Sequence, residues 1–159
     1  MSAARSCAAL LLAGLLACSS EADSGSIEAE LGQGEIEFAP LAEDDTLPYA
    51  AGSQGGHHVF ISFRARGIDP ERVLVSVETT IEDRPKLTLR REGRVNFEPS
   101  GKDTHDYAGW PAQILLAPCH KGERAHIAAT LTDREDRSVD LERWIHIGEG
   151  PEPSPTLCD

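Results

Sequence analysis

Residues 125–147, AHIAATLTDREDRSVDLERWIHI, have the pattern of a β-hairpin. In its two arms, 125–132 and 138–147, apolar residues alternate with polar ones, which is the period of strands that bury one face. The charged residues 133–137 between the arms are typical of a turn. Only Arg143 interrupts the apolar face of the second arm, and there we expect either a bulge or a long side chain that extends to solvent.

Shorter runs with the same alternation precede this hairpin, at 58–65, 73–80, 86–90, 95–97 and 112–117. Clusters of Gly, Pro, Asp and Glu separate the runs, as turns separate strands. The sequence therefore predicts an all-β fold, an antiparallel β-sandwich of about seven to eight strands over residues 35–150, with a small β-barrel as the alternative. The hairpin is similar to the closing hairpin of immunoglobulin-like and fibronectin-type domains, and this resemblance implies an immunoglobulin-like sandwich.

The first eighteen residues have the organisation of an export signal. One positive charge, Arg5, precedes the apolar residues 6–16, a run too short to cross a bilayer as a helix. The run ends in Leu15-Leu16-Ala17-Cys18, and polar residues follow from Ser19. These four residues resemble the lipobox of bacterial lipoproteins.

The lipobox resemblance implies that residues 1–17 are removed and that Cys18 becomes the first residue of the mature protein. It also implies a diacylglycerol thioether on Cys18 and an acyl chain such as palmitate on its amino group. Two or more chains anchor a protein stably in a membrane. Ser19 is similar to the second mature residue of lipoproteins sorted to the outer membrane rather than the inner one. An ordinary secretory signal, in which Cys18 is incidental, is the alternative.

The segments on either side of residues 35–150 differ from them in composition. Residues 18–34, which begin with the lipidated Cys18, are small, acidic and rich in Gly and Ser, so we expect a flexible linker. Residues 151–159 are a Pro-rich tail.

Cysteine usage predicts one disulfide. Cys7 leaves with the signal and Cys18 carries lipid, so an exported protein retains Cys119 and Cys158. If the run 112–117 and the two hairpin arms are antiparallel neighbours, both cysteines lie at the same pole of the sandwich. We therefore expect a Cys119–Cys158 bridge that pins the tail.

The charge of the chain excludes nucleic acid as a partner. The formal charge is −12, from 27 acidic and 15 basic residues. Phosphate binding requires clustered Lys and Arg, whereas an acidic balance suits an exposed, soluble domain. The sequence also lacks a nucleophile elbow and a phosphate-binding loop, so we expect neither an enzyme nor a cofactor.

Three aromatic residues are candidates for a binding patch. Tyr107 and Trp110 lie in a turn before the run 112–117, and Trp144 lies on the polar face of the last strand. Together they could stack on a glycan or contact a protein partner. The alternative is that Trp110 closes one end of the core.

Histidines and acidic residues suggest two further sites. His57, His58, His126 and His146 are candidates for zinc or copper, which requires three or four converging ligands. A calcium site in the hairpin turn is suggested by Asp133, Glu135, Asp136 and Asp140. Arg134 and Arg137 lie among these carboxylates, so an internally paired turn is the favoured interpretation.

These observations together predict a lipid-anchored cell-envelope protein that binds another envelope protein or a glycan and has no catalytic activity. The alternative is a periplasmic or surface lipoprotein that binds copper or zinc through its histidines.

Overall fold

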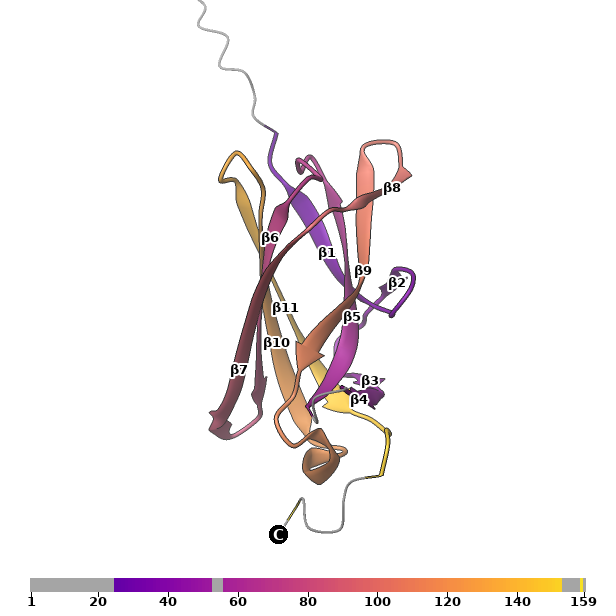
Figure 1. Ribbon diagram of the computed structural model, residues 1–159, viewed down its shortest axis with the longest axis vertical. Coiled ribbons are helices and arrows are strands. Elements are labelled where there is room, and N and C mark those ends of the chain that lie inside the picture. Colours follow the sequence, from indigo (N-terminus) through magenta and orange to yellow (C-terminus); the bar gives the residue numbers. More distant parts are fainter. Residues whose placement is uncertain (1–24, 53–55, 153–157, 159) are drawn as a thin grey trace, which may run out of the picture.

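The computed structural model describes residues 25–52, 56–152 and 158, which form two β-sheets packed face to face (Figure 1). No helix within these residues is long and apolar enough to cross a membrane. The elements are β1 (Glu28–Gln33), β2 (Ala39–Pro40), β3 (Asp45–Leu47), β4 (Tyr49–Ala51), β5 (His57–Arg66), β6 (Val73–Ile81), β7 (Arg84–Val95), β8 (Glu98–Gly101), β9 (Thr104–Gln113), the 3₁₀ helix η1 (Ala117–His120), β10 (Arg124–Thr132) and β11 (Ser138–Ile147).

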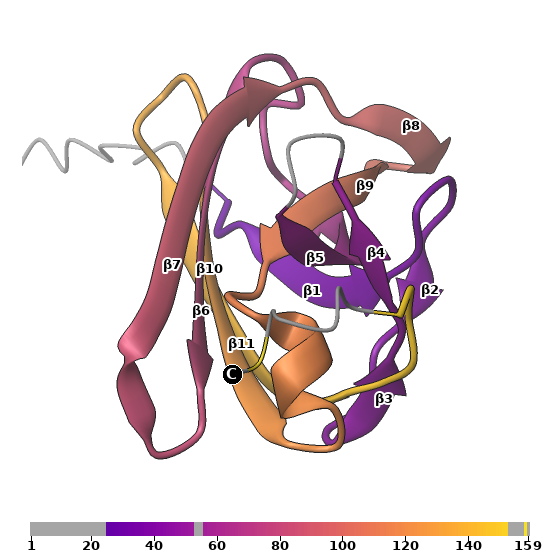
Figure 2. The same cartoon turned by 60° about the horizontal axis from the view of Figure 1, so that its bottom comes forward.

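The two sheets form the predicted sandwich. One has the strand order β2-β1-β5-β9-β8, with β4 beside β5, and the other has the order β3-β11-β10-β6-β7. All pairs are antiparallel except β3 with β11. Figure 2, turned toward one pole, shows β7, β6, β10 and β11 as one layer and β1, β5 and β9 as the other. The expected all-β sandwich is confirmed.

The strand order is also that of an immunoglobulin-like domain. If β1, β5, β9 and β8 are lettered A, B, E and D, and β11, β10, β6 and β7 are lettered G, F, C and C′, the sheets read A-B-E-D and G-F-C-C′. This is the division of strands in immunoglobulin sandwiches. The cysteines lie elsewhere, because β5 and β10 contain none and antibody domains bridge those two strands.

The apolar residues of the alternating runs face the core between the sheets, and the residues between them face outward. Val75 and Ile127 are 0% exposed and lie between the sheets, whereas Ser76 and Ala128 line the outer face of their sheet. The two sheets are also joined by a hydrogen bond that the buried Thr79 hydroxyl of β6 donates to the carbonyl oxygen of Gln113 in β9.

Arg143 reaches solvent without a bulge. β10 and β11 pair in unbroken register, with Ile127 opposite Arg143, so Arg143 starts on the inner face. Its side chain is 32% exposed, and its guanidinium lies 3.7 Å from the Glu43 carboxylate. The expectation of a side chain that extends to solvent is confirmed, and the alternative of a bulge is wrong.

The predicted strands at 86–90, 95–97 and 112–117 differ in their bounds or their position from the observed ones. The run 112–117 is wrong as a strand, because β9 ends at residue 113 and residues 117–120 form η1. β9 also lies in the sheet opposite β10 and β11, so it is not their neighbour. The run 86–90 lies within β7, whereas only Val95 of the run 95–97 belongs to that strand.

A bulge in β9 explains why the alternation in the sequence does not predict the bounds of this strand. Trp110 pairs with Ile61 and Tyr107 pairs with Phe63, so β9 carries one more residue than β5 between these pairs. The extra residue shifts the alternation of apolar side chains. Gly109 lies in the bulge with φ of 79°, a value that glycine adopts without strain.

The linker prediction for residues 18–34 is wrong in its second half. Residues 28–33 form β1, which pairs with β5 in a register that places Leu31 opposite Phe63. Leu31 is only 1% exposed, so this segment contributes to the core. Its acidic residues are the outer positions of an alternating strand, and they made the segment resemble a solvated tether. The domain therefore begins before residue 35, and residues 18–24 lie outside the described residues.

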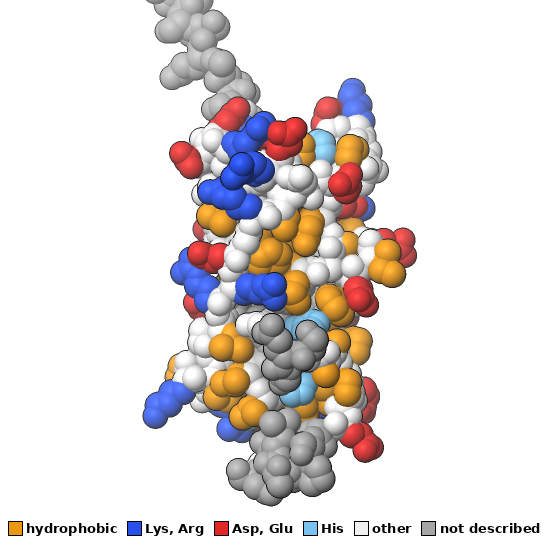
Figure 3. All heavy atoms as spheres, viewed as in Figure 1, with side chains coloured by type: hydrophobic (Ala, Val, Ile, Leu, Met, Phe, Trp, Pro, Cys, Tyr) orange, Lys and Arg blue, Asp and Glu red, His pale blue; other side chains and the backbone are white. Residues whose placement is uncertain are grey.

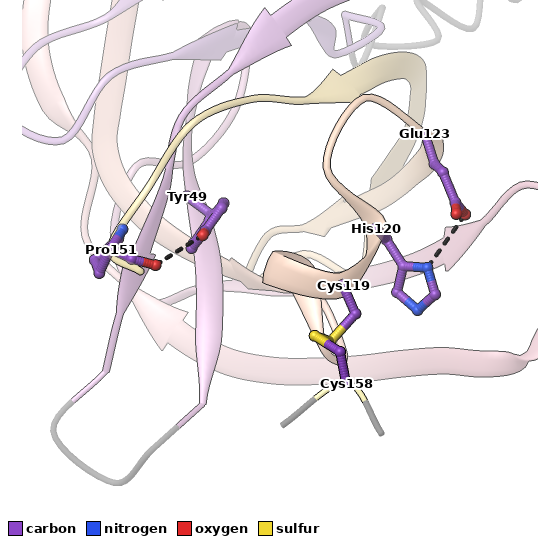
Figure 4. Close-up of a disulfide and its surroundings, with 6 residues drawn as sticks. All are labelled: Tyr49, Cys119, His120, Glu123, Pro151 and Cys158. Atoms are coloured by element: carbon purple, nitrogen blue, oxygen red, sulfur yellow. Dashed lines mark hydrogen bonds and ion pairs between the residues drawn. A yellow bond between two sulfur atoms is a disulfide. The ribbon is translucent and has the colours of Figure 1, made fainter. Parts of the chain in front are cut away.

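The predicted Cys119–Cys158 disulfide is confirmed (Figure 4). The Cα atoms are 5.5 Å apart, and Cys119 belongs to η1 at the pole where β9 and β11 end. β9 and β11 are not the neighbouring strands that the prediction assumed, but strands of opposite sheets can also end at one pole. The tail has a second attachment, since the hydroxyl of Tyr49 donates a hydrogen bond of 2.8 Å to the carbonyl oxygen of Pro151.

Loss of the disulfide should free the end of the tail and leave the sandwich folded. The bridge closes a loop of 39 residues, for which the chain-entropy model gives about 4 kcal/mol of stabilisation, and usually less in practice. We expect Cys158→Ser to lower the free energy of unfolding by up to about 4 kcal/mol. Urea unfolding measures this, together with thiol titration of the denatured wild-type protein without reductant. Two reactive thiols in the wild-type chain, besides Cys18, would contradict the bridge.

Candidate functional site

The three candidate aromatic residues do not form one surface patch. Trp110 is 4% exposed and lies under Gly93 of β7, so it is a core residue, but at the side of the sandwich and not at one end as the alternative had it. Tyr107 is half-buried and packs against Trp110, with ring centroids 6.4 Å apart. Trp144 belongs to the other sheet, where the Arg124 guanidinium lies 4.7 Å and the His126 ring 4.8 Å from its ring centroid. No open aromatic surface for a sugar ring is thus built from these three residues.

The four candidate histidines are divided between the two sheets. His57 and His58 lie on β5, and His126 and His146 lie on β10 and β11. In the hairpin, His126 pairs with Trp144 and His146 with Arg124, so the two histidines share a face but are offset by two residues. Within residues 25–52, 56–152 and 158, no three His, Cys, Asp or Glu side chains converge as a metal site would require.

His58 lies in a partly desolvated position at the edge of the sandwich. Burial lowers the pKa of its imidazole below the ordinary value, and the nearby positive charge of Arg91 lowers it further. Its ring packs edge-on against Phe60, with centroids 4.8 Å apart. Burial and the positive charge of Arg91 both favour the neutral form of the His58 imidazole.

The acidic turn 133–137 is internally paired, as the arginines within it suggested. The Asp133 side chain is 0% exposed, and its carboxylate accepts hydrogen bonds from the backbone N–H groups of Glu135 and Arg137. The Arg137 guanidinium donates two more, at 3.0 and 2.7 Å. Because these donors occupy both carboxylate oxygens, Asp133 does not present them to a cation.

The most distinctive surface is the edge of the sandwich between β7 and β9. β7 is the last strand of its sheet and pairs with β6 alone in the described part of the chain. β9 pairs with β8 only over residues 104–106, so its edge from 107 to 113 has no neighbouring strand among the described residues. Two unpaired strand edges thus flank the same side of the molecule, which Figure 1 shows from the front.

Apolar side chains lie between these two edges. In Figure 3, hydrophobic side chains run along the middle of this face, beside basic side chains on the left, where Figure 1 places β7. Trp110 lies beneath β7, because a Cβ on Gly93 would be 3.2 Å from the Trp110 ring. Two adjoining hollows share His57 and Gln113, and they reach β7 at Leu89 and at Arg91. We call this region, β7 with the hollows beside it, the β7 edge.

The β7 edge is strongly basic in an acidic protein. β7 reads RPKLTLRREGRV, so its 12 residues hold 5 of the 15 basic residues of the chain and a single acidic one. Arg84 pairs with Glu123 and Arg90 with Glu92. Lys86, Arg91 and Arg94 have no carboxylate within ion-pair distance in the part of the chain that the structure describes. These three cations are therefore available to a partner.

Sequence reasoning missed this site although its charge is visible in the sequence. Five cations within 12 residues could have been noticed, but the position of β7 at an edge depends on the order of strands in the sheet. Of the predicted candidates, His57 and His58 lie at the β7 edge, Trp110 forms part of its floor, and Tyr107 packs against Trp110 on the facing strand β9.

Comparison of the sequence with protein-family models and with curated proteins finds no match. Among solved structures, the chain is similar to the CooA pilin subunit from enterotoxigenic Escherichia coli. The two share 11% sequence identity, with a TM-score of 0.38, over 77% of this chain and 99% of the pilin chain.

Proposed function

We propose that this chain is a lipid-anchored, non-enzymatic protein of the cell envelope, and that its sandwich binds another envelope protein along the β7 edge. The observation that carries the proposal is the long strand β7, whose outer edge pairs with no described strand and which bears three cations that no described carboxylate neutralises. The lipobox residues Leu15-Leu16-Ala17-Cys18 support the anchor, and Ser19 supports the outer membrane as its location.

The position of the N-terminus supports the proposed arrangement. β1 begins at Glu28, close to the pole opposite the disulfide (Figure 1). Nine residues, 19–27, separate Cys18 from β1. β7 runs between the two poles, so an anchor at one pole leaves the side of the sandwich open to a partner.

A protein partner is favoured over a glycan by the state of the aromatic residues. Glycan binding commonly uses an exposed aromatic face, whereas Trp110 is buried and Trp144 is contacted by Arg124 and His126. An unpaired strand edge offers backbone N–H and C=O groups, which suit an extended polypeptide.

The anchor is tested by Cys18→Ser, with Cys7→Ser as a matched control within the signal. We expect Cys18→Ser to abolish labelling by radioactive palmitate and to move the protein out of the membrane fraction, because the thioether needs the Cys18 sulfur. Cys7→Ser should leave labelling and fractionation unchanged. Normal membrane partitioning of Cys18→Ser would contradict the lipoprotein assignment.

The partner arm of the same experiment uses chemical cross-linking in cells. Charge reversal at Lys86 and Arg94 should remove a cross-linked species that the wild-type protein forms, because both cations lie on β7 and pair with no described carboxylate. Lys102→Glu with Lys121→Glu changes the net charge equally away from β7 and should retain that species. A cross-link that survives both pairs of changes would place the partner elsewhere.

A further inference from the structure

We infer that the β7 edge binds an acidic, extended segment of a partner protein, which adds to the sheet as a further strand beside β7. This inference rests on the proposed function and names the chemistry of the partner. It follows from three features of β7: its free backbone groups, its unneutralised charge and the partly covered apolar side chains on its inner face.

The backbone of β7 is a template for another strand. In an antiparallel pair, every second residue of each strand turns its N–H and C=O toward the partner, and the others turn theirs away. β7 pairs with β6 in continuous register from Val95 to Thr88 and again at Arg84, so about half of residues 88–95 direct these groups to the free side. Edge strands are commonly short, which limits such pairing, whereas β7 has 12 residues.

The charge on β7 selects an acidic strand. Arg90 and Arg94 lie opposite Glu78 and Leu74 of β6, so they share one face of the sheet, and Arg91 lies on the other. Acidic residues at alternate positions of an added strand would lie opposite the arginines of one face. A symmetric pairing of β7 with β7 of a second copy is disfavoured, because it would set like charges against each other.

The inner face of β7 provides the apolar part of the contact. Leu87 and Val95 pack against the core but remain partly exposed, as does Tyr107 across the gap on β9. An added strand would place alternate side chains over these residues and over the hollow lined by Leu89 and Leu115. Leu115 is 38% exposed, unusually high for a leucine of this chain. The partner segment therefore alternates acidic with apolar or β-branched residues.

The test is amide hydrogen exchange, measured by NMR on the purified full-length mature protein in detergent micelles. The probe is a pool of ten-residue peptides with Glu or Asp at alternate positions and Val, Ile, Thr or Tyr between them. A second pool replaces Glu and Asp with Lys and Arg. We expect the acidic pool to slow exchange at least about tenfold at alternate amides of residues 86–95, because only those on the free side gain a partner.

The matched variants separate strand addition from general attraction between charges. Lys86→Glu with Arg94→Glu should weaken the protection at least about tenfold, whereas Lys102→Glu with Lys121→Glu should leave it unchanged. Three results would overturn the inference: no protection of β7 by the acidic pool, equal protection by the basic pool, or protection that appears without peptide as the protein concentration rises. The last would identify a second copy as the occupant. A cross-linked partner lost with the β7 charges, but without β7 protection, would leave the proposed function standing and reject strand addition.

Discussion

Replacement of Val75 by Asp is expected to unfold the domain. Val75 is 0% exposed, and on β6 it pairs with Leu131 of β10 and with Gly93 of β7. A carboxylate at this position would lose its hydration in the apolar core between the sheets, which costs more than about 4 kcal/mol. Domains of this size are stable by about 5–15 kcal/mol, so most of the protein should be unfolded or aggregated. Circular dichroism and urea unfolding of the purified protein measure the effect.

The matched control for Val75→Asp is Ser76→Asp, one residue further along the same strand. Ser76 lies on the outer face of the sheet, and its hydroxyl accepts a hydrogen bond of 3.1 Å from Arg90. An Asp there keeps an acceptor near the guanidinium, and it also lies near Glu92, its pairing partner on β7. These effects oppose each other, so we expect a change within about 1 kcal/mol. Equal tolerance at positions 75 and 76 would contradict the register of β6.

The parts of the fold that the sequence predicts well are those where one regular pattern runs without interruption. β6 and β10 alternate over their full lengths and β11 does so except at Arg143, and these three strands occupy the centre of their sheet. β9 is misplaced because its bulge at Gly109 shifts the pattern. β1 is missed because Glu28 and Glu30 alternate with small apolar residues, a composition shared with solvated linkers.

The candidate site depends on information that local patterns do not contain. A strand with many cations is compatible with the edge of a sheet, where the cations can prevent aggregation, but not with its centre. Whether β7 is an edge strand or a central strand is decided by the path of the whole chain through the two sheets. In the same way, Trp110 looks like a surface aromatic until Gly93 of β7 is placed over it.

Asp133 is a buried charge that holds together the pole at which the described chain begins. Its carboxylate holds the β10–β11 turn through Arg137, and Asp69 of the β5–β6 loop donates a weaker hydrogen bond of 3.4 Å from its backbone N–H. Arg137 also donates a hydrogen bond of 3.2 Å to the carbonyl oxygen of Gly25, where the described chain begins. One carboxylate therefore connects the turn, a neighbouring loop and the residues that precede β1.

We expect Asp133→Asn to lower the free energy of unfolding by about 3 kcal/mol, because it removes the buried counter-ion of Arg137, leaves that guanidinium only the exposed Glu135 carboxylate, and directs an amide N–H₂ toward donors. The matched control is Asp136→Asn in the same turn. Asp136 is exposed and has φ of 59°, a conformation that Asn tolerates, so its replacement should change stability by less than about 0.5 kcal/mol. Urea unfolding at pH 7 measures both variants.

The difference between wild type and Asp133→Asn should shrink in acid. Burial by itself raises the pKa of Asp133, but the hydrogen bonds from the backbone and guanidinium of Arg137 and from neighbouring backbone N–H groups outweigh it, so the pKa lies below its ordinary value. A carboxyl whose pKa is lower in the folded than in the unfolded state stabilises the fold at pH values above the unfolded pKa of about 3.9. That stabilisation is lost as the pH falls through the folded pKa, when both states carry the proton. The difference in unfolding free energy between wild type and variant should thus be constant from pH 7 to about pH 5 and narrow progressively below about pH 4.

Asp69, Asp106 and Glu123 also have lowered pKa values, so the wild-type protein loses stability in acid for several reasons. Only the difference between wild type and Asp133→Asn isolates the contribution of Asp133. A gap that stays constant down to the acid transition would show that the negative charge of Asp133 is not what holds the turn.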